Sequence, residues 1–118
     1  MIAIRGPSNR TKRTPSGIGD IFLLTHDPLM VEAQTLGSAL AAYSREYRVE
    51  IRPYDGSDPH IPFSPGELPK YFFYKKADGT SWLVDIHIMR ATESICPRQD
   101  LNVRLQSGDE VHIGELAC

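Results

Sequence analysis

The chain has 118 residues, of which 41% are hydrophobic and 24% are charged, an ordinary balance for one globular domain. It contains no apolar run near the ~18 residues of a membrane helix and no apolar segment typical of a secretory signal, so we expect neither a membrane span nor secretion. The triplet Asn9-Arg10-Thr11 matches a glycosylation acceptor, which we attribute to chance without a secretory route. Two distant cysteines, Cys96 and Cys118, form no CxxC pair and favour a reducing compartment over a disulfide framework.

Positive charge is concentrated at the N-terminus. Residues 1–19 carry a net charge of +4 and the rest of the chain carries −6. Glycine, proline, serine and threonine separate the charges without helical or strand periodicity, so we expect an extended arm. A basic arm on an acidic body is typical of contact with nucleic acid or another anion, and a solvated tail is the alternative. The basic residues of the arm are Arg5, Arg10, Lys12 and Arg13.

A strand, a helix and a second strand are expected next. The apolar run at residues 21–25 is typical of a buried strand. Asp27 suits a helix N-cap and Pro28 the first helical position, which predicts a helix over residues 28–46. Its apolar face would consist of Leu29, Ala33, Leu36, Leu40, Tyr43 and Tyr47, at spacings of 4, 3, 4, 3 and 4. Residues 48–54 alternate in polarity and predict the second strand.

Two hairpins are expected in the rest of the chain. The proline-rich segment 55–69 is interpreted as a long loop. Strands at about 70–76 and 81–90 flank the turn Asp78-Gly79 and form the first hairpin. In its second strand, Leu83, Asp85, His87 and Met89 alternate with Trp82, Val84, Ile86 and Ile88, so the two sets lie on opposite faces. Residues 101–106 and 110–116 flank Ser107-Gly108-Asp109 and predict a second hairpin.

This order predicts an α/β fold with a thioredoxin-like core, in which a right-handed crossover joins two parallel neighbouring strands. Pro69 would precede the third core strand. We assign residues 1–19 to the extended arm, residues 20–95 to the thioredoxin-like domain, and residues 96–118 to a C-terminal extension containing the second hairpin.

No catalytic, cofactor or metal site is expected. Residues 25–30, where a thioredoxin-type enzyme holds its thiols, contain no cysteine, so no thiolate nucleophile can form there. No histidine pair has the helical spacing of metal ligands. Asp85 and His87 on one strand face could bind metal or assist a base, and a half-exposed edge-strand face is the favoured interpretation. Asp78 followed by Asp85 and His87 loosely matches a metal-dependent nuclease pattern, with His87 in place of its lysine.

The stretch VEIRPYDGSDPHI…LPKYFFYKKADGTSWLVDIHIMRATESI resembles a thioredoxin-like family of mitochondrial ribosomal proteins and a small accessory subunit of respiratory complex I. Residues 49–53 match its second strand, Pro69 its proline, residues 71–74 its aromatic strand, Gly79 its turn and residues 83–88 its valine-rich strand. The chain departs from the pattern in its longer loop before Pro69 and in Pro97, which cuts the terminal helix short.

The resemblance implies a non-catalytic structural subunit, in the mitochondrial matrix, without a cofactor. Within the family, the basic arm favours a ribosomal protein that contacts rRNA and neighbouring ribosomal proteins. An accessory subunit of complex I, contacting other protein subunits, is the first alternative, and a virion-assembly or binding module is the second. Two of the four consecutive aromatics should point away from the helix and form a protein interface, unless a second layer covers them. These aromatics are Tyr71, Phe72, Phe73 and Tyr74.

Overall fold

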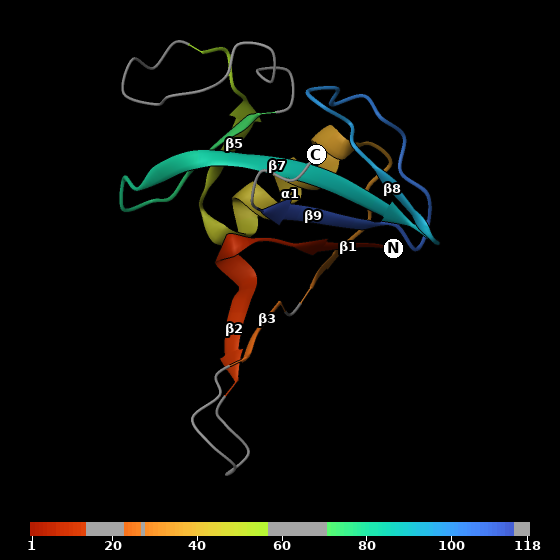
Figure 1. The fold of residues 1–118 in the computed structure, drawn as a ribbon, viewed down its shortest axis with the longest axis horizontal. Coiled ribbons are helices and arrows are strands. Elements are labelled where there is room, and N and C mark those ends of the chain that lie inside the picture. The colour runs from red at the N-terminus through yellow and green to blue at the C-terminus, as the bar shows by residue number, and fades with distance from the viewer. Residues whose placement is uncertain (14–22, 27, 57–70, 115–118) are drawn as a thin grey trace.

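The computed structural model describes residues 1–13, 23–26, 28–56 and 71–114, and for residues 10–13 and 23–26 it describes the backbone only. Figure 1 shows one helix packed against a curled, mixed sheet, with a two-stranded ribbon extending away from it. In chain order the elements are β1 (Ile2–Arg5), the short 3-10 helix η1 (Pro7–Asn9), β2 (Arg10–Arg13), β3 (Leu23–His26), β4 (Leu29–Val31), α1 (Leu36–Tyr47), β5 (Glu50–Pro53), β6 (Phe72–Lys75), β7 (Ser81–Arg90), β8 (Glu93–Ile95) and β9 (Glu110–Gly114).

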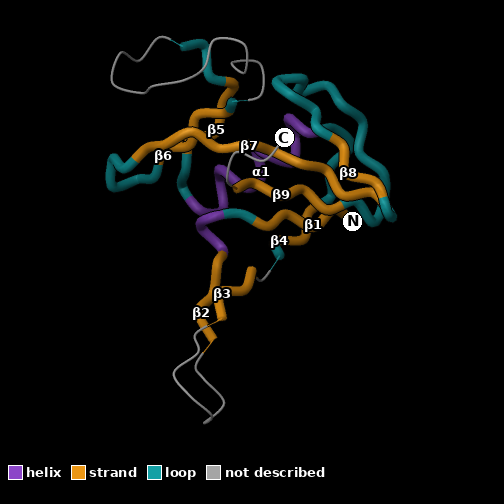
Figure 2. Tube along the Cα trace, in the orientation of Figure 1, coloured by secondary structure: helices purple, strands orange, loops and turns teal. Residues whose placement is uncertain are grey.

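The main sheet is organised around two strands from opposite ends of the described chain. Its order is β4-β1-β9-β7-β6-β5, and β8 also pairs with β7. β1 runs parallel to β9 and antiparallel to β4, whereas β9 is antiparallel to β7. Figure 2 shows these strands side by side, with α1 across one face. The sheet therefore has a central parallel pair, β1 and β9, and α1 connects the two outermost strands, β4 and β5, along the chain.

The core lies between α1 and the sheet. Leu36, Leu40 and Tyr43 present the buried face of the helix. Opposite them, alternate residues of the central strands are fully or almost fully buried: Ile2, Ile4, Phe72, Tyr74, Val84, Ile86, Ile88, Val111 and Ile113. Trp82 packs against this cluster, so the predicted division of the β7 strand into two faces is confirmed.

The helix is shorter than predicted, because it begins at Leu36 rather than near residue 28. Thr35 and Ser38 form a capping box that satisfies the free N–H groups of the first turn. Leu29 and Val31 instead lie in β4, where they pack against the core while Met30 between them is 48% exposed. Apolar residues at 29, 33 and 36 suit a helical period, but the free edge of β1 offered residues 29–31 a strand partner.

The α/β class is confirmed, and the thioredoxin-like core is not. The predicted first strand overlaps β3, which pairs with β2 in a separate two-stranded sheet. The strands flanking α1 are β4 and β5, and they lie at opposite ends of the main sheet rather than as parallel neighbours. The β6–β7 hairpin with its glycine turn is as predicted, and β5 pairs antiparallel to β6.

Both ends of the described chain also differ from expectation. Residues 2–5 of the predicted arm form β1, because Ile2 and Ile4 are buried and pair between two strands. The predicted C-terminal hairpin is absent, since β9 pairs with β1 and β7 and residues 101–106 form no strand of the described sheet. A local sequence window contains neither of these distant partners.

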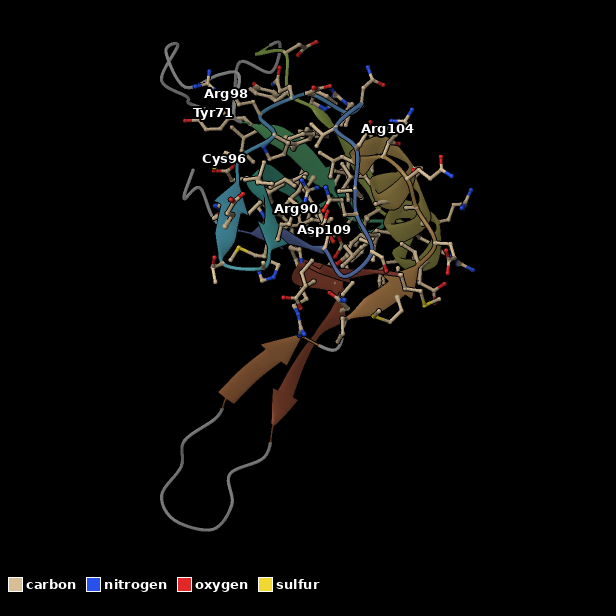
Figure 3. The ribbon with its side chains drawn as sticks, turned by 90° about the vertical axis from the view of Figure 1, so that its right-hand side faces the viewer. Tyr71, Arg90, Cys96, Arg98, Arg104 and Asp109 are labelled. Atoms are coloured by element: carbon tan, nitrogen blue, oxygen red, sulfur yellow. The ribbon has the colours of Figure 1, made fainter. Side chains whose placement is uncertain are left out.

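The loop after β8 is held against the sheet by one ion pair. Arg90 lies at the end of β7, and its Nη2 is 2.8 Å from Oδ2 of Asp109. The same Nη2 also donates to the Arg104 carbonyl. Asp109 additionally accepts the Gln106 N–H at 2.8 Å. Figure 3 shows Arg90 and Asp109 next to each other, close to the start of β9. The Arg90 hydrogen bond holds the pKa of Asp109 below its ordinary value, against the opposing effect of burial.

We expect Leu36→Ala to lower the free energy of unfolding by about 2–5 kcal/mol, through lost burial and a residual cavity. Leu36 is fully buried on the core face of α1. Met30→Ala is the control, because Met30 is half-exposed, and its effect should stay within about 0.5 kcal/mol. Urea unfolding of both variants measures the difference, and equal losses would contradict this placement of the helix.

We expect Asp109→Asn to lower the free energy of unfolding by about 1–3 kcal/mol at pH 7, because the amide cannot replace a charge-assisted pair. The folded-state pKa of Asp109 is depressed, so its contribution is fully present above the unfolded value of about 4 and is lost as the pH falls through the folded value. Urea unfolding of both proteins between pH 7 and pH 2 should show the difference shrinking in acid. A difference independent of pH would contradict the assignment.

Candidate functional site

The most distinctive feature of the molecule is the two-stranded ribbon formed by β2 and β3. The two strands are antiparallel, with Arg10 opposite His26 and Arg13 opposite Leu23. Figures 1 and 2 show the ribbon pointing away from the main sheet rather than packing on it. β2 has the sequence RTKR, with three basic residues and no acid. Basic residues that the sequence assigned to a flexible arm therefore stand on a hydrogen-bonded ribbon.

A compact turn connects β1 to the ribbon. Asn9 is buried, its Oδ1 accepts the Gly6 N–H at 2.7 Å, and its Nδ2 donates to the Ile4 carbonyl at 2.8 Å. One side chain thus satisfies two backbone groups where the strand pairing of β1 ends. The chain can change direction here without leaving these polar groups unpaired.

Two tyrosine hydroxyls fasten this turn to the body. Tyr43 of α1 accepts the Ser8 N–H at 2.9 Å and donates to Asn9 Oδ1 at 3.3 Å. The hydroxyl of Tyr74 in β6 forms a short hydrogen bond with Ser8 Oγ. Burial raises the pKa of Tyr43, and the adjacent Tyr74 hydroxyl raises it further, so the Tyr43 hydroxyl stays protonated. The base of the ribbon is therefore tied to both the helix and the sheet.

Gly6 allows the turn to approach the helix closely. A Cβ atom at this position would lie 2.6 Å from the Tyr43 hydroxyl oxygen and 3.3 Å from Ile113 Cβ. The first distance is shorter than real contacts permit, so any side chain would displace Tyr43 or the turn. The stretch Gly6-Pro7-Ser8-Asn9 is thus fitted to Tyr43 sterically as well as by hydrogen bonds.

Asn9, the residue of the glycosylation match, has a structural role in the turn. Its amide is 7% exposed and fully engaged in the turn, so it is not presented to solvent as an acceptor. Sequence reasoning missed this role of Asn9. The combination of glycine, proline, serine and asparagine did signal a turn, but its partners Tyr43 and Tyr74 lie far away in sequence.

Arg5 does not belong to the ribbon. It ends β1 and its Nε lies 3.2 Å from Glu110 Oε1, so its charge is paired on the main sheet. The four basic residues predicted to act together are therefore divided between two places. Only Arg10, Lys12 and Arg13 stand on β2.

The four consecutive aromatics do not form an exposed interface. Phe72 and Tyr74 are fully buried under α1, while Tyr71 and Phe73 lie on the other face and are 5% and 8% exposed. These last two form a second small core with Tyr54 and Leu83. Their expected direction away from the helix is thus confirmed, but the interface prediction is wrong because they are covered.

Two polar contacts lie over this second core. The side chain of Gln99 donates to the carbonyls of Tyr54 and Tyr71 at 2.7 and 2.9 Å, which holds the segment after β8 against the ends of β5 and β6. The Arg52 guanidinium lies 4.6 Å from the centre of the Phe73 ring. The covering layer therefore comes from the C-terminal third of the chain, as a loop rather than the predicted hairpin.

The strand β7 is central rather than at an edge, which changes the interpretation of Asp85 and His87. Asp85 is 2% exposed, whereas His87 is half-buried. Asp78 lies in the exposed hairpin turn, where it accepts the Thr80 N–H at 2.9 Å. Asp85 lies four residues into β7, roughly 13 Å from the strand start, so the two carboxylates of the nuclease pattern do not converge. Within the described ranges, no three acidic, histidine or cysteine side chains are grouped to hold a metal ion.

Residues 25–30 and Cys96 also differ from what the sequence predicted. Residues 25 and 26 lie in β3 and residues 29 and 30 in β4, so they form no strand-to-helix turn. Cys96, which follows β8, is disulfide-bonded, and the described residues include no free cysteine. The expectation of reduced cysteines is therefore wrong for Cys96, because sequence separation does not measure separation in the fold. Cys118 and most of the loop at 55–69 lie outside the described residues.

No protein-family model, curated protein or solved structure matches the chain. The described part of the chain also contains no helix with the length and apolarity needed to cross a membrane. The functional argument therefore rests on the molecule's own geometry.

We expect Tyr43→Phe to lower the free energy of unfolding by about 1–3 kcal/mol, because it leaves the part-buried Ser8 N–H without its acceptor. Tyr74→Phe leaves the Ser8 N–H with its Tyr43 acceptor, and it should cost less. Gly6→Ala should be destabilising in the natural chain and less so in the Tyr43→Phe background, where the closest atom is gone. A double-mutant cycle by urea unfolding measures this coupling, and strict additivity would contradict it.

Proposed function

We propose that this protein is a non-catalytic structural subunit that docks onto RNA, within a larger assembly, through its β2–β3 ribbon. The observation that carries the proposal is a basic two-stranded ribbon that projects from an otherwise closed body and whose base is fixed by Asn9 and Tyr43. An element that projects from the body in this way is suited to contacts with another molecule.

The charge distribution supports a polyanionic partner. Arg10, Lys12 and Arg13 follow within four residues on β2, whereas the whole chain has a net charge of −2. Contacts between basic side chains and phosphates supply most of the sequence-independent affinity for nucleic acids. Such contacts position a protein without reading base sequence. The negative body would face away from RNA, toward proteins or solvent.

The fixed base lowers the entropic cost of binding for the ribbon relative to a flexible arm. Hydrogen bonds from Ser8 and Asn9 to Tyr43 hold the residues directly before Arg10. An ordered element loses less conformational entropy on binding than a disordered one, so more of the electrostatic attraction remains as affinity.

The mitochondrial ribosome, in the matrix, is the assembly that we propose on the family resemblance, with rRNA and neighbouring ribosomal proteins as partners. The resemblance concerns the β5–β6–β7 region, where the proline, the aromatic strand and the glycine turn match. The strand order adds no support for the thioredoxin-like family, so the RNA-docking ribbon carries more weight than the resemblance.

The alternative is docking to protein, as in an accessory subunit of respiratory complex I or a virion-assembly module. The observation that favours it is the apolar pair Leu23-Leu24 on β3, directly across from Arg13 and Lys12. A ribbon with basic and apolar residues also suits an acidic protein groove. The partner chemistry therefore has to be decided by experiment.

The test is RNA binding by the full chain and by single ribbon variants. Three phosphate contacts should give a log–log salt slope of roughly −2, at about 0.7 units per contact for a single strand. Each of Arg10→Ser, Lys12→Ser and Arg13→Ser should reduce the slope by about 0.7 units. Fluorescence anisotropy with a single-stranded RNA between 50 and 200 mM salt measures these slopes.

Arg5→Ser and Arg45→Ser are the matched controls, because Arg5 is paired with Glu110 and Arg45 lies at the exposed end of α1. Both should leave the slope unchanged. Deletion of residues 1–19 is unsuitable, since it removes β1 from the centre of the sheet. Equal slopes for all variants, or no binding by the natural chain, would overturn RNA docking. Crosslinking of the ribbon to acidic protein within an assembled particle would then establish the alternative.

A further inference from the structure

Two histidines face each other across the centre of the sheet. His87 of β7 is the register partner of His112 of β9 in an antiparallel pair. The residues next to them in sequence, Ile86, Ile88 and Val111, are buried on the α1 side. Because strand side chains alternate, both histidines point outward from the opposite, outer face of the sheet. Directly opposed residues of this kind have Cβ atoms about 4.5–5.5 Å apart. Both side chains are half-buried.

His112 offers a ring nitrogen without a partner. Its Nε2 is buried and makes no hydrogen bond, and the nearest carboxylate oxygen, Glu110 Oε2, is 3.8 Å away. Burial lowers the pKa of His112; Glu110 opposes this effect, whereas Arg5 and His87 reinforce it. A neutral imidazole carries a lone pair on one ring nitrogen, and that nitrogen is the atom that binds a metal ion.

The charged groups around the pair are favourable to a cation. Glu110 lies on the same face as His112, two residues before it, and Arg5 neutralises part of its charge from 3.2 Å. Asp85 precedes His87 by two residues on β7 and is buried on that face. The carboxylates of Glu110 and Asp85 are thus on the same face of the sheet as the two imidazoles, each two positions from a histidine.

We propose that His87 and His112 form a two-histidine site for a divalent transition-metal ion on the outer face of the sheet. Imidazole nitrogen is a preferred ligand of Zn²⁺, Cu²⁺ and Ni²⁺. Two nitrogens bound to Zn²⁺ at about 2.0–2.1 Å lie roughly 3–3.5 Å apart, within reach of opposed rings on neighbouring strands. Water would complete the coordination beyond the two imidazoles.

The site was invisible in the sequence because 25 residues separate the two histidines. The spacing rules for metal ligands concern residues on one helix or in one loop, whereas here the strand register brings the ligands together. The inference is independent of RNA docking, since the ribbon and this face of the sheet share no residue.

The test is a Zn²⁺ titration of the full chain, purified without a polyhistidine tag and followed by isothermal calorimetry in buffer without reductant. We expect one ion per chain. His87→Ala and His112→Ala should each raise the dissociation constant at least tenfold. His26→Ala is the matched control, because His26 lies on the ribbon, and it should leave the dissociation constant unchanged; His60→Ala completes the set of single histidine variants.

A second measurement locates the ion without relying on affinity. Substoichiometric Cu²⁺ should broaden the imidazole proton resonances of His87 and His112 before those of His26 and His60. Circular dichroism of each variant shows whether it is folded. Retained binding in a folded double variant, or an equal loss in the control variants, would overturn the proposal.

Discussion

The parallel pairing of β1 with β9 is the constraint on which the rest of the structure depends. It aligns Ala3 with Glu110 and Ile4 with Val111, so the first and last described strands meet in the middle of the sheet. β4 then pairs with the free side of β1, and β7 with the free side of β9. The helix packs on the apolar face that these strands complete. Without this pairing, Ile2 and Ile4 would not be buried in the core. The turn that follows Arg5 would then not be positioned against Tyr43.

The same pairing positions, at different places, the two surfaces for which we propose functions. At the end of β1, the turn through Asn9 redirects the chain into the basic ribbon, and the Tyr43 hydroxyl holds that turn against α1. On the outer face, β9 places His112 opposite His87 and Glu110 beside Arg5. One surface presents positive charge away from the body, and the other presents two imidazoles beside the Glu110 carboxylate. Their chemistry differs, so each can be removed by substitution without changing the other.

The position of Arg5 shows how the fold divides a charge pattern that looks uniform in sequence. Four basic residues occur within nine positions, but the strand ends after Arg5, and Glu110 then pairs with that guanidinium. The remaining three stand beyond the turn, on β2. A charge count along the chain correctly locates the basic segment, yet it overstates the number of cations available to a phosphate backbone.

Short-range chemistry in the sequence by itself determined several parts of the protein. Strand alternation assigned the two faces of β7, and Asp78-Gly79 marked the β6–β7 turn, because both depend on neighbouring residues. The position of the basic segment before residue 14 was likewise readable. The tertiary structure alone decided the start of α1, the burial of the four aromatics, the anchoring of Asn9 by Tyr43 and the pairing of His87 with His112. Each of these features requires a partner distant in the chain. The central strands β1 and β9 come from the two ends of the described chain, so such partners meet only when these strands pair.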